Sequence, residues 1–528
     1  MKDQFLGKAF FLTLTGLTLA FFVAYFSLHT GAETVFLLLI GLATLLLATH
    51  KLEYGLYIAL AELIGTSHGH LFTAGGISIR MAIFGAVMIA WLTHLARGRR
   101  VAIGANQWDR PYILLLISII IGFVVGLRGA DTDVIKNVIN DGNGYFYVLY
   151  IFPMLTVNWD AIKRRVLLQV FAGAATFISV LTLLILYLFT HTTEPVQRAL
   201  YAFFRDARIA ELTKVTGDIF RIFLQAQFFS VVLLLVIAAA MFWFWRQRRD
   251  QTILALWFIL TMSALIISLS RSFWIGLIVG GLTLAVSAIS IRRPSIKEIL
   301  VKKAAGLLML ITSVALLWVV LAFPLPRPAN VSGFGDLLSD RTLDGGDAAI
   351  SSRWNLLPEM QKTIAESPII GSGFGKIIAF ESDDPRVREI YPDGKWRTYA
   401  FEWGWLDLWI KMGLLGPIAM IWLGLSVGFG LVRGFRDEHG WLNIGLFAGL
   451  VALYAIHTFS PYLNHPIGLG YIIFLTPFLV AKKQKAHEGA MVAIREVIEK
   501  TIVHTPAQIP KAPSVSSRQA EPVPWAEV

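Results

Sequence analysis

Long apolar runs constrain this chain of 528 residues more than any other feature. Runs of about 17 to 25 residues recur along the chain, and each can cross a bilayer as a helix. Apolar residues make up 56% of the chain and charged residues only 15%, whereas soluble domains are about 25% charged. The pattern predicts an all-α, polytopic integral membrane protein with about 14 transmembrane helices. It excludes a soluble enzyme and a β-barrel, whose strands would alternate in short segments.

The limits of the predicted spans follow the apolar runs. The 14 spans lie near residues 9–28, 34–49, 54–65, 77–95, 111–127, 144–158, 166–190, 219–245, 252–269, 272–291, 303–323, 404–432, 442–459 and 466–481. The first run is longer than the roughly 7 to 15 residues of a signal-peptide core, so an uncleaved anchor is expected. The absence of cysteine excludes disulfides, thiolate metal sites and thiol nucleophiles.

Basic residues alternate between connections and thereby predict the orientation. Twenty lysines and arginines lie in the N-terminal segment and one set of connections. The short connections of the other set hold Lys136 alone, apart from Arg271 in a tight hairpin. Because basic connections stay on the cytoplasmic side, both termini are predicted to be cytoplasmic. The net charge of +11 is therefore interpreted as a topology signal, and no nucleic-acid partner is expected.

Two connections on the predicted outer side are long. Residues 191–218 place apolar side chains at helical spacing opposite Arg198, Arg205 and Arg208, which predicts an amphipathic helix on the membrane surface. This helix either seals the interface or binds anionic head groups. The expected organisation is an N-terminal membrane region over 1–323, an extracytoplasmic loop subdomain with 12 acidic residues over 324–403, a C-terminal membrane region over 404–481 and a largely disordered cytoplasmic tail over 482–528.

Five basic residues remain at the predicted outer ends of spans, where positive charge opposes the orienting rule. They are Arg80, Arg128, Arg221, Arg271 and Lys411. Ionisable groups in spans are costly and are functional candidates by default, so these cations are expected around a cavity for an anionic, lipid-attached group. The alternative is that each side chain reaches outer head groups or pairs with a carboxylate. For Lys411 the partner would be Asp407, four residues earlier on the same helical face.

The tight hairpin carries a motif that resembles a known family. Ser270-Arg-Ser-Phe-Trp-Ile-Gly276 is similar to the signature of the O-antigen ligase and O-antigen polymerase superfamily of bacterial membrane glycosyltransferases. Further pieces follow the family's order, namely Arg221-Ile-Phe-Leu-Gln-Ala-Gln, Arg353-Trp-Asn-Leu-Leu-Pro, Ser367-Pro-Ile-Ile-Gly-Ser-Gly-Phe-Gly375 and Met412-Gly-Leu-Leu-Gly416. The resemblance covers roughly residues 215–435. Ligases of this family usually carry a histidine where this chain has Glu402, so ligase and polymerase both stay open.

The resemblance implies transfer of a glycan from an undecaprenyl-diphosphate carrier to an acceptor hydroxyl on a glycan or lipid-linked glycan. Such transfer takes place at the periplasmic or exterior face of the bacterial inner membrane, inverts the anomeric centre, and needs no nucleotide sugar, metal or other cofactor. Membrane lipids are the remaining partners. The alternative from another class is a lipid-linked oligosaccharide flippase or polysaccharide transporter, although such proteins usually show repeated halves, which this sequence lacks.

Arginine suits this chemistry because its guanidinium fork matches phosphate oxygens and stays charged. Arg221 and Arg271 are the expected diphosphate ligands, and Glu402 is the expected catalytic base. Additional substrate contacts are expected from Arg80, Arg353, Arg208, Trp403 and Trp405. Two alternatives are open: Glu402 is a loop acid paired with Arg397 or Lys395, and the tryptophans are interfacial anchors.

Two motifs are set aside. Gly371-Ser-Gly-Phe-Gly-Lys376 lacks the spacing of a phosphate-binding loop, and a turn that supports the outer loop is the expected structure. His68 and His70 lack the further ligands that a metal site requires.

Overall fold

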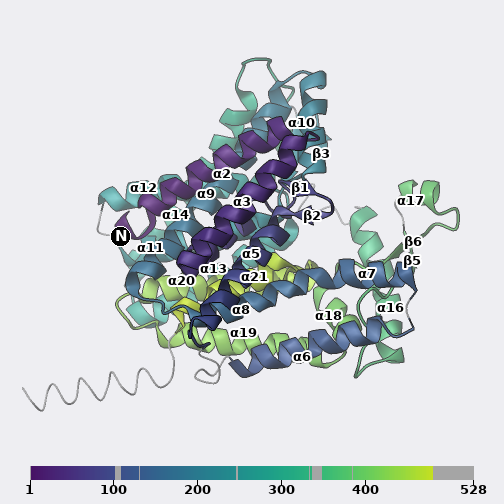
Figure 1. The fold of residues 1–528 in the computed structure, drawn as a ribbon. Helices are drawn as coiled ribbons and strands as arrows, with labels where there is room; N and C mark the ends of the chain where they lie inside the picture. Colours follow the sequence, from purple (N-terminus) through teal and green to yellow (C-terminus); the bar gives the residue numbers. More distant parts are fainter. Residues whose placement is uncertain are drawn as a thin grey trace, which may run out of the picture. The chain divides into compact units, whose positions relative to one another are not determined.

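The computed structural model describes residues 2–101, 109–129, 131–244, 248–331, 333–335, 348–382 and 385–479. Most of these residues are helical, and eleven helices among them are long and apolar enough to cross a membrane (Figure 1). They are α2 (Lys8–Ser27), α3 (Gly31–His50), α5 (Ile79–Ala96), α6 (Asp109–Gly126), α9 (Ala161–His191), α11 (Phe228–Trp243), α12 (Arg248–Ile267), α13 (Arg271–Arg292), α14 (Ile296–Ala322), α19 (Leu415–Arg433) and α20 (Gly440–Phe459). The predicted class, an all-α membrane protein, is confirmed. The predicted tail over 482–528 lies outside the described residues.

The number of spans differs from the predicted 14 because three apolar runs form short helical pieces. Residues 54–65 belong to α4 (Leu52–Gly65), residues 144–158 form η1 (Asn143–Tyr150) and α8 (Ile151–Thr156), and residues 466–481 contain α21 (Pro466–Phe474) and η4 (Thr476–Phe478). Nearly all side chains of α4 and α21 are buried by other helices. These runs are apolar because protein surrounds them, and a helix buried on all sides looks like a membrane span in sequence. The run 404–432 also divides, at Gly413, into α18 (Gly404–Met412) and α19.

The helices differ in how deeply they lie in the membrane region. In the most apolar 18-residue stretch of each span, 83% of the residues of α9 and of α11 are buried inside the protein, but only 17% of those of α3 and of α14. Helices α9 and α11 are therefore central, and α3 and α14 are peripheral. Helix α13 packs closely along α20, where added Cβ atoms at Gly276 and Gly280 would lie 3.3 and 3.0 Å from the carbonyl oxygens of Ala452 and Ala448. Small residues at this spacing allow helix backbones to approach within a membrane.

Short elements connect the spans. They are α1 (Lys2–Phe5), the hairpin β1 (Thr73–Ala74) and β2 (Ile77–Ser78), α7 (Thr132–Gly142), α10 (Glu194–Asp206), the hairpin β3 (Glu211–Thr216) and β4 (Ile219–Phe223), η2 (Gln225–Gln227), α16 (Ala348–Glu366), β5 (Ile378–Glu381), α17 (Pro385–Ile390), β6 (Lys395–Thr398) and η3 (Tyr462–Asn464). The helix predicted within 191–218 is α10, and it ends where Arg208 adopts a left-handed conformation before β3. Beyond this turn the helix does not continue, because residues 211–216 form β3. We call the end of the membrane region that carries residues 324–403 the loop end.

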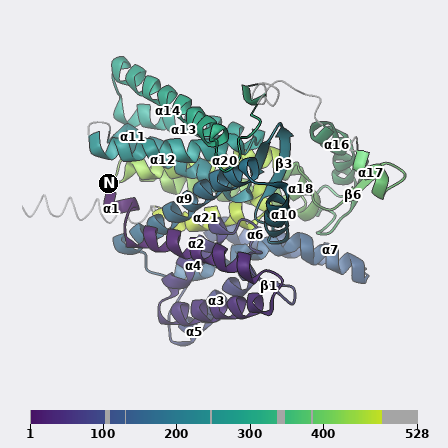
Figure 2. The same cartoon turned by 90° about the horizontal axis from the view of Figure 1, so that it is seen from above.

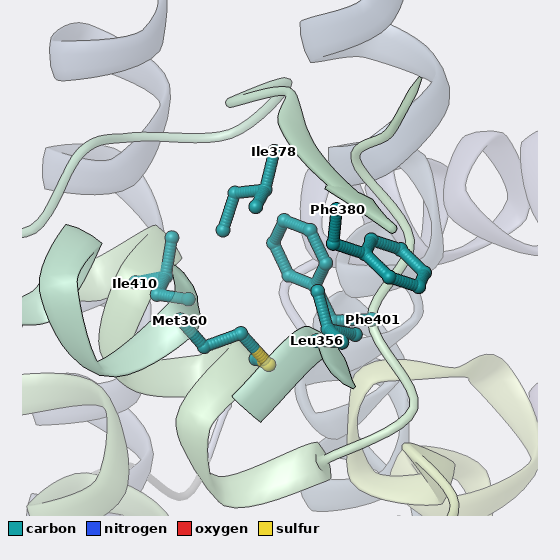
Figure 3. Packing of buried hydrophobic residues seen from close by; sticks show 6 residues of the cluster. All are labelled: Leu356, Met360, Ile378, Phe380, Phe401 and Ile410. Carbon is teal, nitrogen blue, oxygen red and sulfur yellow. The ribbon is translucent and has the colours of Figure 1, made fainter. Parts of the chain in front are cut away.

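The described part of the segment 324–403 has a small core of its own. Six buried side chains from α16, β5, α18 and the intervening chain pack together, as Figure 3 shows: Leu356, Met360, Ile378, Phe380, Phe401 and Ile410. Ile410 belongs to α18, so this core continues into the helix that follows the segment. The packing fixes α16 and residue 402 relative to α18.

The glycine-rich sequence 371–375 forms the turn that its sequence predicts. Gly371, Gly373 and Gly375 all have φ between +76° and +82°, a region in which side chains other than glycine are strained. Within this turn the Phe374 N–H donates to the carbonyl of Gly122 in α6 at 3.1 Å. The Gly375 N–H donates to a carboxylate oxygen of α7 at 2.8 Å. The turn therefore ties the segment 324–403 to the membrane helices.

Candidate functional site

A pocket of about 380 Å³ opens at the loop end. Five separate stretches of the chain line it. They supply Glu211, Arg221, Phe223 and Gln225 from the β3–β4 hairpin and its exit; Leu269, Ser270, Arg271 and Ser272 before and at the start of α13; Arg353 from α16; Glu402 from the chain before α18; and Ser460, Pro461, Tyr462 and His465 between α20 and α21. Four residues predicted from the sequence, Arg221, Arg271, Arg353 and Glu402, thus share one cavity.

Arg221 is positioned by strand pairing. It lies in β4 opposite Thr213, while Phe223 pairs with Glu211 in the same antiparallel register. Its Nε donates a hydrogen bond to the carbonyl of Ser268 at 3.0 Å, and its guanidinium lies 4.9 Å from the centre of the Phe223 ring. These contacts hold the guanidinium against the hairpin, next to the start of α13.

Arg271 is the first residue of α13 and follows a sharp turn. Leu269 has φ of 49°, an uncommon conformation for a side chain other than glycine, and it turns the chain from α12 into α13. The hydroxyls of Ser270 and Ser272 lie 3.1 Å apart, and Ser460 donates to Ser272 at 3.3 Å. The Ser-Arg-Ser motif therefore forms a polar wall at the N-terminal end of α13, where the helix dipole also favours an anion.

Glu402 and Arg353 form an ion pair on the loop side of the pocket. The Arg353 Nε donates to a Glu402 carboxylate oxygen. The predicted alternative, in which Glu402 pairs with Arg397 or Lys395, is not found among the described contacts, since Arg397 pairs with Asp393 at 2.6 Å. Trp403 donates its indole N–H to the Arg353 carbonyl at 2.9 Å, and this bond helps to hold Arg353 in place.

Sequence reasoning missed Glu211, the second carboxylate of the pocket. Although Glu211 remains exposed to solvent, partial desolvation raises its pKa, Arg221 opposes this rise, and the charge of Glu402 adds to it. The residue escaped notice because the stretch was read as part of an amphipathic helix. Only the pairing of β3 with β4 brings it beside Arg221.

Sequence reasoning also missed Tyr462 and His465, although a polar interruption, Ser460-Pro-Tyr-Leu-Asn-His465, separates the last two apolar runs. Tyr462 donates its hydroxyl to the carbonyl of Gln225 at 3.2 Å and joins two walls of the pocket. The Nδ1 of His465 accepts the Ile467 N–H at 3.3 Å. Desolvation lowers the pKa of His465 well below its usual value, so the ring is neutral near pH 7.

Other predicted binding residues lie outside the pocket lining. Arg80 is buried and pairs with Glu62 at 3.1 Å, and it also donates to the Ser67 carbonyl at 3.0 Å. Trp405 packs edge-on against the ring of His457, and Arg208 occupies the turn between α10 and β3. Arg128 is exposed after the end of α6.

Lys411 makes the ion pair that its spacing suggested. Its Nζ lies 2.7 Å from an oxygen of Asp407 and 2.5 Å from an oxygen of Asp141 in α7. Asn464 donates to the other oxygen of Asp407. All three charged side chains are almost fully buried. We call Asp141, Asp407, Lys411 and Asn464 the buried tie, because it links α7, α18 and the pocket segment 460–465.

No group of three or more potential metal ligands occurs among the residues that the structure describes. The pocket is instead dominated by three guanidinium groups and two carboxylates. Guanidinium groups bind phosphate oxygens in a fork geometry, and a carboxylate can accept a proton from a hydroxyl. The arrangement fits chemistry on a phosphorylated substrate.

A comparison with protein families agrees with this chemistry. The model of the O-antigen ligase family matches residues 254–421, about a third of the chain, which confirms the resemblance predicted from the sequence. The matched segment contains Arg271, Arg353, Glu402 and the glycine-rich turn, and it supports a membrane glycosyltransferase of the ligase or polymerase type. Neither the curated proteins nor the solved structures include a significant match.

Proposed function

We propose that this pocket transfers a glycan from an undecaprenyl-diphosphate carrier to an acceptor hydroxyl at the outer face of the bacterial cytoplasmic membrane. The observation that carries the proposal is the convergence of Arg221, Arg271, Arg353 and Glu402 in one cavity at the loop end. These residues come from widely separated parts of the sequence, and a general stability requirement does not explain why three cations share a cavity.

In this proposal Arg221 and Arg271 hold the diphosphate of the donor. Negative charge grows on the diphosphate as the bond to the sugar breaks, so fixed guanidinium groups stabilise the transition state more than the ground state. The N-terminal end of α13 adds its dipole at the same place. Because Arg221 is already oriented by Ser268 and Phe223, little reorganisation is needed when the donor binds.

Glu402 is the proposed base, and Arg353 orients its carboxylate through their ion pair. The carboxylate accepts the proton of the acceptor hydroxyl while that oxygen attacks the anomeric carbon of the donor sugar. The bond between this carbon and the diphosphate oxygen breaks, and its electron pair leaves with undecaprenyl diphosphate. A single displacement of this kind inverts the anomeric centre.

The proposed orientation follows from the course of α13. This helix begins at Arg271 in the pocket and ends at Arg292, whose guanidinium donates to the carbonyls of Phe242 and Trp243. Its 22 residues correspond to about 33 Å, enough to cross the hydrocarbon core. The basic connections therefore lie across the membrane from the pocket, and the positive-inside rule assigns them, together with both termini, to the cytoplasm.

The proposal is tested with purified protein and an undecaprenyl-diphosphate-linked glycan. Arg271→Ala and Arg221→Ala should each abolish transfer while leaving insertion and folding intact, because each removes a charge that the leaving group requires. Arg128→Ala, an exposed cation outside the pocket, is the control and should keep wild-type activity. Full activity in both pocket variants would refute the proposal.

A deletion strain separates the related activities. Loss of ligation leaves bare acceptor and long carrier-linked chains, loss of polymerisation leaves single repeat units, and loss of a flippase leaves units on the cytoplasmic face. The last pattern would replace the proposed transfer by transport.

A further inference from the structure

A second cavity, of about 770 Å³, lies within the membrane region between α2, α3, α4, α5 and α9. It forms because α2 and α3, which follow one another in the chain, pack against different helices. Helix α2 packs mainly on α9, whereas α3 packs mainly on α5, and Figure 2 shows α4 between these two pairs. We call this cavity the crevice.

The crevice is long and mainly apolar. Thr13 and Tyr57 also line it, and its charged groups gather at its two ends, with Lys51, Glu53, Asp160 and Lys163 at one end and Glu62 at the other. Its lining begins at Lys51 and Tyr54, at the start of α4, and reaches Glu62 and Thr66 at the other end. The 14 residues of α4 rise by about 21 Å, roughly two thirds of the hydrocarbon thickness. At the far end Glu62 forms an ion pair with Arg80, so the crevice presents no unpaired charge to a ligand there. Its shape and polarity fit a hydrocarbon chain running along the membrane normal.

The far end of the crevice adjoins the pocket. Thr66 lines the crevice, and Arg80 bonds to the next residue, Ser67. Two positions after Thr66, the ring of His68 packs edge-on against that of His465, with 5.9 Å between centres. His465 itself lines the pocket. Residues 66–68 therefore connect the lining of the crevice with that of the pocket, so the two cavities are neighbours.

Small residues interrupt the crevice wall on α2, between the larger side chains of Leu12, Thr13 and Leu17. Ala9, Gly16 and Ala20 all line the cavity, and Ala61 faces them from α4. A Cβ added at Gly16 would meet nothing within 4 Å, so space is open there. Small side chains leave recesses along the slot that a chain with regularly spaced methyl branches can fill better than a straight acyl chain.

We propose that the crevice holds the polyprenyl chain of the donor while the diphosphate occupies the pocket. This inference rests on the proposed function, since it assigns a place to the lipid part of the same substrate. Binding the chain there fixes the direction from which the diphosphate enters and leaves the acceptor side of the pocket open.

The test fills the crevice and compares two donors that carry the same glycan. One donor has the full undecaprenyl chain, and the other has a short, water-soluble prenyl chain. Gly16→Leu and Ala20→Leu should raise KM for the long donor about tenfold or more, because the side chain occupies the space of the chain. For the short donor kcat/KM should stay within about twofold of wild type.

Gly306→Leu is the matched control, because Gly306 lies in a span, α14, outside the crevice and its added Cβ also meets nothing within 4 Å. It should leave both donors unaffected. Unchanged kinetics of Gly16→Leu and Ala20→Leu on the long donor would refute the crevice assignment, and so would equal losses on both donors. Wild-type protein that is inactive with both donors would instead refute the proposed function.

Photolabelling of the wild-type protein supplies a readout that needs no variant. A photoreactive polyprenyl diphosphate should label lining residues of α2 and α4, with competition from undecaprenyl diphosphate. Labelling of these residues by a photoreactive phospholipid that undecaprenyl diphosphate does not displace would overturn the proposal.

Discussion

The two glutamates of the pocket differ in what holds them. The Glu402 side chain bonds to Arg353, whereas among the described residues the Glu211 side chain makes no hydrogen bond and the residue is held by the pairing of β3 with β4. The ion pair orients the carboxylate of Glu402, whereas partial desolvation raises the pKa of Glu211. The two glutamates therefore differ in their surroundings, and this difference leads to two predictions.

Replacement of Glu402 by Gln keeps the shape of the side chain but removes the proton acceptor. If Glu402 is the base, kcat should fall about 10²-fold to 10⁴-fold while KM for the donor changes little. Steady-state kinetics checks this, with Glu381→Gln as a control because Glu381 is an exposed acid in β5. Unchanged turnover in the Glu402 variant would make that residue a structural acid.

The raised pKa of Glu211 predicts how donor affinity depends on pH. An ionised Glu211 repels the diphosphate, so binding favours the protonated form, and affinity should rise as pH falls through the pKa of this group. Glu211→Gln should remove that part of the pH dependence. Binding isotherms of the same donor across pH 4 to 8 check this, because titration of the ligand itself cancels between the two proteins. Identical pH profiles would contradict the assignment.

At the scale of elements, the buried tie explains how the loop segment and the membrane helices keep one geometry. Lys411 neutralises Asp407 and Asp141, and Asn464 extends the network to the segment that carries Tyr462 and His465. The glycine-rich turn meets the same network through Asp141. Although these groups lie outside the pocket lining, they hold the segment 460–465, which lines the pocket.

Removing the cation of this network should destabilise the fold strongly. Lys411→Met leaves two buried carboxylates without a counter-charge, a change that typically costs about 3 to 5 kcal/mol. Thermal unfolding in detergent should show a large fall in the unfolding temperature, and Asp407→Asn in the same chain should restore part of it. Arg397→Ala breaks an exposed ion pair and should leave the unfolding temperature nearly unchanged. Similar stability of Lys411→Met and wild type would contradict this account.

Element boundaries also show where sequence reasoning succeeds. Long spans such as α9 and α13 follow from apolar length alone, because lipid imposes that length. The runs over α4 and α21 were read as spans since burial in protein selects the same residue types. Arg221 and Arg271 were identified because they carry positive charge at the predicted outer ends of spans. Glu211 and His465 were not, because only strand pairing and helix packing bring them to the pocket.

At the scale of the whole molecule, the predicted topology can be tested because the chain has no cysteine. Glu389 and Lys297 are exposed and lie on opposite sides of the membrane in the proposed orientation. In intact cells, a membrane-impermeant thiol reagent should label Glu389→Cys and should reach Lys297→Cys only after lysis. Labelling of both positions before lysis, or the reverse pattern, would refute the proposed orientation.

The distribution of pocket residues along the chain has a consequence for synthesis. Arg271 is made about 190 residues before His465, which corresponds to roughly 10 to 40 s of translation. During that interval the hairpin and the start of α13 have no opposite wall. A chain that stalls before η3 therefore has no complete cavity, and catalytic competence arises only when the last helices have been inserted.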